Sequence, residues 1–426
     1  MAVKPPSKSS PGSSPAPVDK QIAELLDPRR PGRVLTELRR RHHERLGSFT
    51  MDILRERGRE PMMIVQGEII VRAKDARRAA RVLGRQFTVE LVAADDPARL
   101  ARLRANIGAT ALADAVRTLR AHCIDASPNG VAAFGMRSKA GVTAEPATGP
   151  MPPIAAPNAG KGTHVVVIDT GMAAAAKSRT DKLLAGIAIN AANTDPLTAI
   201  NKQVHGVDLL DAAAGHGTFV AGIVRQVAPK CKITMIRALD SDGVGTELSV
   251  RNAIIAAAHL KPHVINMSFG AESLDNQPPV ALSDAVAQAA AISPDTVLVA
   301  AAGNSPDSVR TWPATLPGVI SVAGLTAAGV PSSWSKHGSW INVSAVGEGV
   351  VSGYVPGTES ATFDQSPDTW AGNDPIAVWI GTSFATPRVA GAIAAGVSSG
   401  LTPKAALAKL VAAGLPMSDW GVVLAI

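Results

Sequence analysis

The sequence predicts an α/β fold of three layers, with a mostly parallel central sheet flanked by helices and a small α+β module placed before it. From Pro157 onward, short and nearly continuous apolar runs alternate with Ala-rich segments of helical periodicity. Such runs are typical of parallel strands that are covered on both faces. The 426 residues are 46% hydrophobic but only 3% aromatic, which favours close helix-on-sheet packing.

The charge is divided unevenly along the chain. Residues 1–150 hold 26 Lys and Arg against 16 Asp and Glu, and the remainder holds 16 against 19. The first part is therefore at +10 and the second at −3, so we expect the first to be an accessory segment. We divide the chain into a disordered or basic helical N-terminal segment (1–60), the α+β module (61–126), a linker (127–157) and the main domain (158–426).

The N-terminal segment is polar at first and then rich in Arg. Residues 1–18 are mainly Pro, Ser and Lys, a composition that predicts disorder. Residues 27–59 combine many Arg with Leu at helical spacing. We interpret them as a solvated helix rather than a nucleic-acid patch, because no aromatic residues interleave for base stacking.

The α+β module and the linker follow from periodicity and composition. The module is predicted to contain strands at 62–71 and 87–92 and helices at 74–83 and 100–119. Residues 125–157 are rich in Gly, Pro, Ala and Ser and indicate an exposed linker.

The main domain is predicted to alternate strands and helices. Its strands lie at 164–168, 233–237, 264–267, 297–301, 319–322 and 341–344, and its helices begin near His216, Leu248, Val280, Ser383 and Pro403.

Composition also restricts the class of protein. Cys123 and Cys231 are too few for a disulfide framework and have no metal-binding spacing. No N-terminal apolar h-region and no run of about 18 apolar residues is present. We therefore expect a cytoplasmic protein with no membrane partner, although export by another route stays open, and we do not expect nucleic acid as a partner.

Four motifs carry the chemistry. Asp169 ends the apolar strand of HVVVIDTG, where open α/β sheets build their sites. His216 lies between two Gly at a helix start in AAGHGTFVAG, and Ser383 stands at the start of another helix in GTSFATPRVAG. Asn304 follows a strand in VLVAAAGNS and can donate to an oxyanion. Taken singly, the acid could as well belong to a turn, a lone Ser at this place is more commonly an N-cap, and a turn Asn after Gly is ordinary.

In order along the chain, five blocks resemble the signatures of the subtilisin-like serine proteases, or subtilases (peptidase family S8): VIDTG, GHGT, VINMSFG, AAGN and GTSFATPRVAG. The resemblance covers residues 158–426, and its order of acid, histidine and serine agrees with that family. One departure is Arg388, where a His is common in relatives, and residues 354–378 do not align.

The resemblance implies the subtilisin-like fold and the role of each motif residue. Ser383 would be the nucleophile, His216 the general base and Asp169 the residue that orients it. Asn304 and the Ser383 amide would form the oxyanion hole. The expected activity is endopeptidase hydrolysis of polypeptide substrates through an acyl-enzyme, with no cofactor for the chemistry; no carboxylate run has the spacing of a Ca²⁺ loop, so structural calcium stays unassigned.

Substrate-binding residues are also carried over from the family. Two segments would pair with an extended substrate and a third would line the P1 pocket; these segments are Gly243, Val244 and Gly245, then Ser268, Phe269 and Gly270, and finally Ala301, Ala302 and Gly303. The small apolar lining predicts an uncharged, apolar P1 side chain.

The front of the chain resembles a prosegment in size and placement, which implies a zymogen. Opposite net charges favour docking of the front segment on the main domain, so we expect it to act as inhibitor and chaperone until the chain is cut within 125–157. The alternative is a catalytically silent subtilase-fold module that binds peptides, which the presence of Asp169, His216, Asn304 and Ser383 disfavours.

Overall fold

A computed structural model describes residues 17–27, 29–45, 49–56, 61–92, 96, 98–133, 143–152, 154, 156–199, 208–364 and 366–426. The main domain is built on an eight-stranded sheet of order β10-β7-β12-β13-β14-β15-β21-β20. All neighbouring strands are parallel except the last pair, β21 and β20. The strands are β7 (His164–Asp169), β10 (Lys232–Arg237), β12 (Val264–Met267), β13 (Val297–Ala301), β14 (Val319–Leu325), β15 (Val343–Val346), β20 (Leu415–Met417) and β21 (Gly421–Val423).

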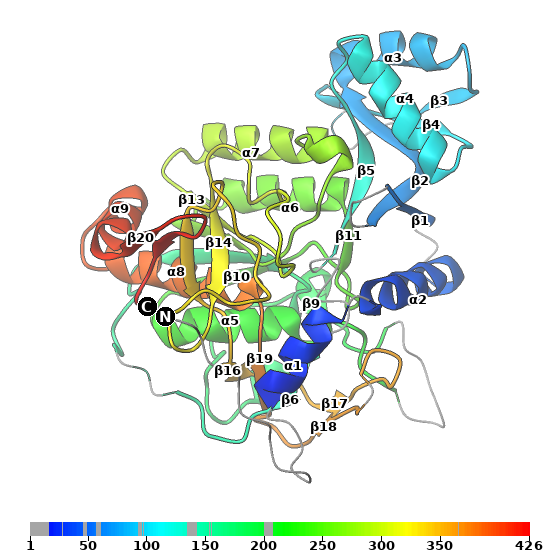
Figure 1. Ribbon diagram of the computed structural model, residues 1–426. Coiled ribbons are helices and arrows are strands. Elements are labelled where there is room, and N and C mark those ends of the chain that lie inside the picture. Colours follow the sequence, from blue (N-terminus) through cyan, green and yellow to red (C-terminus); the bar gives the residue numbers. More distant parts are fainter. Residues whose placement is uncertain are drawn as a thin grey trace, which may run out of the picture.

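Helices cover both faces of this sheet, as Figure 1 shows. They are α5 (His216–Val227), α6 (Glu247–His259), α7 (Val280–Ile292), α8 (Thr382–Val397) and α9 (Pro403–Ala413). Val165 and Val167 of β7 join the core of α5 and α8, whereas Val166 and Ile168 join the core of α6 and α7. Alternate residues of one strand thus enter two cores, which explains the unbroken apolar run. The predicted three-layer fold is confirmed.

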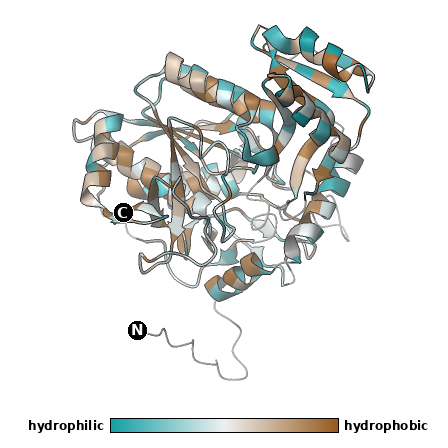
Figure 2. Ribbon diagram, turned by 45° about the horizontal axis from the view of Figure 1, so that its top comes forward, coloured by the Kyte–Doolittle hydropathy of each residue, from teal (hydrophilic) through white to brown (hydrophobic). Residues whose placement is uncertain are grey.

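The module forms a separate body beside α6 and α7 (Figure 1). Its elements are β1 (Met51–Leu54), β2 (Met62–Arg72), α3 (Ala76–Leu83), β3 (Val89–Val92), β4 (Leu100–Ala105), α4 (Ala109–Ala121) and β5 (Ala126–Ala133). Its antiparallel sheet has the order β11-β5-β2-β4-β3, with β1 on β2. Because β11 (Val244–Thr246) belongs to the main domain, one sheet runs through both bodies. Figure 2 shows hydrophobic and hydrophilic positions on the same helices, as expected where one side of a helix covers a core.

Two helices precede the module, α1 (Pro17–Leu26) and α2 (Arg30–Arg45). The prediction of a solvated Arg-rich helix is wrong for α2, because Leu35, Leu38, Arg41 and His42 are all buried. The predicted disorder of residues 1–18 is wrong at its end, since α1 begins at Pro17, and residues 1–16 lie outside the described residues.

Two further predictions in the first third of the chain need correction. The helix expected over 100–119 is a strand up to Ala105, because Ala101, Leu103 and Ala105 alternate inward with two arginines and the strand pairs with β2. The linker expected at 125–157 is a strand over 126–133, held between β2 and β11.

Short elements complete the structure. They are the strands β6 (Glu145–Pro146), β8 (Met172–Ala173), β9 (Thr194–Asp195), β16 (Val350–Gly353), β17 (Gly357–Thr358), β18 (Thr369–Trp370) and β19 (Ile376–Trp379), and the 3-10 turns at 73–75, 174–178, 191–193 and 274–276. No helix in the described parts of the chain has the length and apolarity needed to cross a membrane.

Candidate active site

Strand β7 places Asp169 at the carboxyl edge of the sheet, as predicted. The Asp169 side chain is fully buried, and its Oδ1 accepts hydrogen bonds from the Thr170 amide and from Nδ1 of His216, both at 2.8 Å. A carboxylate that accepts from Nδ1 fixes the ring orientation and leaves Nε2 as the nitrogen that can take a proton. Asp169 and His216, 47 residues apart in sequence, thus form a dyad.

His216 is the first residue of α5, and the two Gly beside it are needed for a reason the sequence did not reveal. Gly215 has φ 77°, and a Cβ there would lie 2.7 Å from a Val355 methyl group. A Cβ on Gly217 would lie 2.0 Å from the Gly171 carbonyl oxygen. The glycines therefore allow close approach of neighbouring segments. The imidazole itself packs against Trp379 and Phe384, with ring centroids 5.5 and 5.2 Å away.

A buried acid that the sequence analysis missed lies behind the dyad. Oδ2 of Asp195 accepts from the Thr170 hydroxyl at 3.0 Å and from the Gly215 amide at 2.9 Å, and the Thr170 hydroxyl in turn accepts from the Gly217 amide at 3.1 Å. Burial raises the pKa of Asp195 to about 7. This network ties the backbone on both sides of His216 to the residue after Asp169. Asp195 has no motif around it, so only the structure could identify it.

Ser383 is the second residue of α8, which begins at the predicted place. Its hydroxyl donates to the Ser268 carbonyl oxygen, and the Ser268 hydroxyl donates to the Ser383 carbonyl oxygen at 2.8 Å. The Ser268 hydroxyl also accepts from Nδ2 of Asn266 at 3.0 Å. The residue after Ser383, Phe384, contacts the ring of His216. The start of α8 is therefore held between β12 and the dyad.

Asn304 is oriented by the residue before Ser383. Its Oδ1 accepts from the amide and the hydroxyl of Thr382, both at 2.8 Å, which assigns the two ends of the side-chain amide. Within the described residues, its Nδ2 is buried and has no hydrogen-bond partner. A buried donor left unused costs roughly 1–3 kcal/mol. An oxyanion next to the Ser383 amide would satisfy it.

The predicted substrate-pairing strand carries a partner from the module. Residues Val244 to Thr246 form β11, which pairs antiparallel with β5: Val244 lies opposite Ala133 and Thr246 opposite Val131. Gly243, at φ 79°, belongs to the turn before β11. A strand of this chain thus lies where the family resemblance places substrate.

The predicted P1 walls meet at Thr311, which carries no motif in the sequence. A Cβ on Gly270 would lie 2.3 Å from the Thr311 methyl group, and one on Gly303 would lie 3.3 Å from the Thr311 hydroxyl and 3.0 Å from Cδ of Lys336. The Lys336 ammonium pairs with Glu272 at 2.9 Å and with Asp307 at 2.5 Å. Ser268, Phe269, Ala301 and Ala302 are buried alongside. The charged trio of Lys336, Glu272 and Asp307 therefore lies beside Gly303, one of the residues predicted to line the P1 pocket.

The departures from the family pattern have structural roles. Nη2 of Arg388 donates to the backbone carbonyl of Ile426 at 2.6 Å and so holds the end of the chain against α8. The segment 354–378 that did not align contributes β17 and β18. In the described residues, no group of three or more His, Cys, Asp or Glu is placed to hold a metal ion.

Comparison with known proteins agrees with this geometry. Residues 160–411 match the Subtilase family. The chain is 32% identical over 239 residues to a thermophilic serine proteinase of Bacillus sp. (strain AK1), which covers 56% of this chain and 53% of that protein. It is 30% identical over 232 residues to thermitase of Thermoactinomyces vulgaris, which covers 54% of this chain and 74% of thermitase.

The chain thus spans about half the length of the first of these relatives. Among solved structures, a lanthipeptide protease is 25% identical, with a TM-score of 0.48 and coverage of 62% of this chain and 83% of that one. The family match covers more than half of the chain and includes Asp169, His216, Asn304 and Ser383. The chain therefore belongs to the subtilase family.

Proposed function

We propose that the protein is a serine endopeptidase that cuts polypeptides with Asp169, His216 and Ser383, and that its front segment keeps it latent until the chain is cut. Two features of the same site support the catalytic part. Asp169 orients the ring of His216, and Asn304, beside the start of α8, keeps a buried Nδ2 without a hydrogen-bond partner in the described residues. A binding module without chemistry has no need for that donor.

The mechanism follows from these positions. Ser383 Oγ turns from the Ser268 carbonyl to the substrate carbonyl carbon and forms the new C–O bond, while its proton goes to His216 Nε2. Asp169 holds the protonated ring. The negative charge on the carbonyl oxygen is taken up by Asn304 Nδ2 and the Ser383 amide. His216 then gives its proton to the leaving amine, and water releases the acyl group by the same steps.

Latency is supported by where the module lies. Strand β5 covers β11, and the side chains of Asp169, His216 and Ser383 are at most 1% exposed in the uncut chain. Glu247 at the start of α6 bridges the two bodies, since its carboxylate accepts from the Gly130 amide of β5 and the Ala281 amide of α7. A substrate strand cannot pair with β11 while β5 occupies it.

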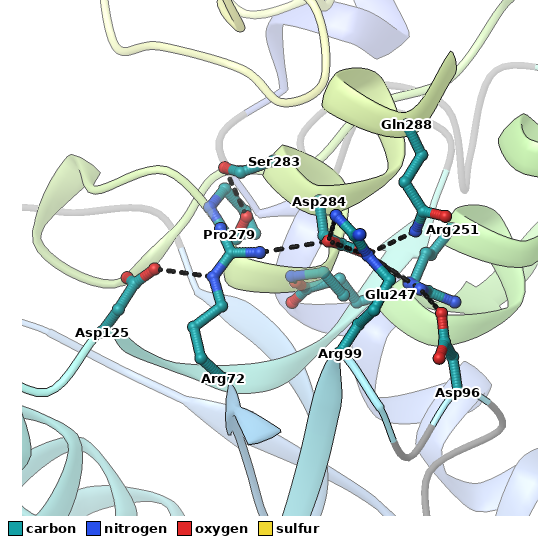
Figure 3. Close-up of polar contacts among 11 residues, drawn as sticks. Arg72, Asp96, Arg99, Asp125, Glu247, Arg251, Pro279, Ser283, Asp284 and Gln288 are labelled. Atoms are coloured by element: carbon teal, nitrogen blue, oxygen red, sulfur yellow. Dashed lines mark hydrogen bonds and ion pairs between the residues drawn. The ribbon is translucent and has the colours of Figure 1, made fainter. Parts of the chain in front are cut away.

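Charge pairs fix the module on α6 and α7. Asp284 of α7 accepts from Arg72 at 3.2 Å and from Arg99 at 2.9 Å, and Arg251 of α6 reaches it from the other side, as Figure 3 shows. Arg117 of α4 pairs with Asp275 at 2.8 Å. These pairs join a basic module to carboxylates of the main domain, in agreement with the opposite net charges.

The catalytic part is tested with a fluorophosphonate probe. We expect the full-length chain to be labelled at Ser383 only after a cut between Ala133 and Thr143, which mass spectrometry locates, and Ser383→Ala to stay uncut and unlabelled. Asn304→Ala should lower kcat by about 100- to 1,000-fold, a range measured on a subtilisin. Absence of labelling in a folded chain that has been cut and from which the module has been removed would favour the peptide-binding module.

A further inference from the structure

The main domain binds a second segment of this chain, whose first helix lies at a place distinct from the module's and whose second helix also contacts the module. We call residues 17–45, which form α1 and α2, the N-terminal arm. Figure 1 shows α1 beside β6 and β19, on the far side of the sheet from α6 and α7. Leu25 of α1 belongs to the core that α5 and α8 share with the sheet, whereas Val34, Leu35 and Leu38 of α2 lie in a core that they share with the module.

The first anchor is Gln21 in α1, whose side chain is fully buried. Its Nε2 donates to the Thr143 carbonyl at 2.9 Å and to the Val378 carbonyl at 3.1 Å. Thr143 is the first described residue after the module, and Val378 lies in β19. Gln21 therefore joins the segment that leads into the main domain to β19, which follows Thr143 by more than 200 residues.

The second anchor is Lys20. Its ammonium lies 2.7 Å from Glu145 and 3.2 Å from Asp364, whose side chains are 7% and 0% exposed. Thr143 donates its hydroxyl to the same Asp364. Burial raises the pKa of Glu145 to about 7 and that of nearby Glu359 to about 9. Lys20 thus brings positive charge into a buried acidic region of the main domain.

The third anchor is the pair Arg41 and His42 in α2, with 2% and 1% exposure. Arg41 lies 2.8 Å from Asp211 and 3.0 Å from Asp242, and its guanidinium stacks 4.9 Å from the Phe363 ring centroid. His42 Nε2 lies 3.2 Å from Asp240.

The partners of Arg41 lie next to functional segments. Asp211 precedes the turn 212–215 that leads to His216, and Asp242 lies in the turn before β11 and accepts from the Ala212 amide at 2.9 Å. Arg41 therefore links the turn before His216 to the turn before the substrate-pairing strand. Removing Arg41 would leave the carboxylates of Asp211 and Asp242 buried without the cation that pairs with them, which is costly.

We infer that the N-terminal arm is a permanent part of the active enzyme, which stays bound to the main domain after the chain is cut between Ala133 and Thr143. This inference rests on the proposed function. The anchoring partners of the arm all lie at or after Thr143, so the first cut breaks none of its contacts with them. The arm is continuous with the module through residues 46–48.

One consequence concerns release of the module. After the first cut, the module is still covalently joined to an arm that stays in place. A short tether of this kind keeps the module at an effective concentration in the millimolar range. Release of inhibition therefore requires a second cut, between Arg45 and Phe49.

Retention of the arm is tested in a Ser383→Ala chain, which cannot cut itself. Residues 134–142 are replaced by the recognition sequence of one site-specific protease, and the sequence of a second protease is inserted between Arg45 and Phe49. After both cuts, size-exclusion chromatography in 0.5 M salt should show the arm co-eluting one-to-one with residues 143–426. Lys20→Met with Arg41→Met should lose the arm, whereas Arg29→Met, at a side chain that is 92% exposed, should keep it.

Elution of the arm without the main domain would overturn the inference, and it would do so without any reading of activity. The order of release is tested in the Ser383 chain with the same two sites. After dilution, the second cut should raise the initial rate of peptide hydrolysis by about tenfold or more over the first cut alone. Full rate after the first cut alone would contradict the tether, and no rate after both cuts, with the arm retained, would count against the proposed function only.

Discussion

Ion pairs between arginines and carboxylates join both the module and the N-terminal arm to the main domain, but the arginine side chains differ in how deeply they are buried. On the module side the module's own guanidinium groups remain in contact with water, since the side chain of Arg99 is 46% and that of Arg117 is 40% exposed, although Arg251 of α6, which pairs with Asp96, is buried. On the arm side the side chain of Arg41 is 3% exposed. Exposed pairs contribute about 0–1 kcal/mol each and are screened by salt, whereas removing one partner of a buried pair costs about 3–5 kcal/mol. The comparison teaches that exposed ion pairs, beside a small apolar contact of Ile70 and Leu100 with α6 and α7, suit a part that must leave, and that buried ion pairs suit a part that stays.

The largest effect should come from the interface with the arm. Arg41→Met in the Ser383→Ala chain should lower the free energy of unfolding by about 3–5 kcal/mol, because Asp211 and Asp242 are left buried without their cation. Denaturant unfolding measures it. Arg39→Met is the matched control, since Arg39 is 54% exposed and should change stability by less than about 1 kcal/mol. Equal losses from both variants would remove the distinction between the two interfaces.

The next effect concerns the carboxylate at the centre of the interface with the module. Asp284→Asn should weaken binding of the module to the main domain by about 10- to 100-fold, because Arg72 and Arg99 both lose their charged acceptor. The measurement uses the doubly cut chain and titrates module against arm-bound main domain. Asp295→Asn, at an exposed site just after α7, should leave the affinity unchanged.

A pH effect separates one bridging residue from the arginine pairs. Burial raises the pKa of Glu247 to about 7, above its ordinary value of 4.5. The folded chain therefore holds this proton while the unfolded chain has lost it, so the stabilisation is complete below pH 4.5 and disappears as pH rises to 7. Glu247→Gln should reduce the fall in unfolding free energy between pH 5 and 8 by roughly 1–2 kcal/mol. An unchanged pH profile would mean that a group other than Glu247 causes the fall in unfolding free energy.

The smallest effect should be that of salt. Raising the ionic strength from 0.05 to 0.5 M should weaken the module's affinity by about threefold, because its half-exposed pairs are screened. The same change should leave retention of the arm unaltered. Both are read from the doubly cut chain, and an arm that dissociates with the same salt dependence as the module would contradict the difference in depth.

Much of the main domain could be predicted because its signals are local. Strands such as β12 and β13 are apolar runs whose limits match the predicted ones, and Asp169, His216 and Ser383 occupy the element ends that their motifs predicted. The strand expected at 341–344 lies two residues later, at Val343–Val346. In β7, α5 and α8, the same short motifs mark where the element begins or ends and which residue belongs to the site.

The first third of the chain was harder to predict because its structure depends on distant partners. The spacing of Leu100, Leu103 and Ile107 fits a helix, whereas the alternation of Ala101, Leu103 and Ala105 fits a strand, and only pairing with β2 decides between the two. Strand β5 has a composition typical of a linker and is ordered by neighbours on both sides. Arg41 resembles any other residue of an Arg-rich helix until Asp211, 170 positions away, lies beside it.

On the proposed function, the three-residue strand β11 restricts which polypeptides can be cut. It accepts its partner edge to edge, through antiparallel backbone hydrogen bonds, as β5 shows. A polypeptide that replaces β5 must therefore present backbone amides and carbonyls that no other part of its own fold is using. Compact native proteins meet this condition only where a loop or terminus opens transiently. On the proposed function, the conformational state of a target, more than the side chains around its scissile bond, determines whether it is cut.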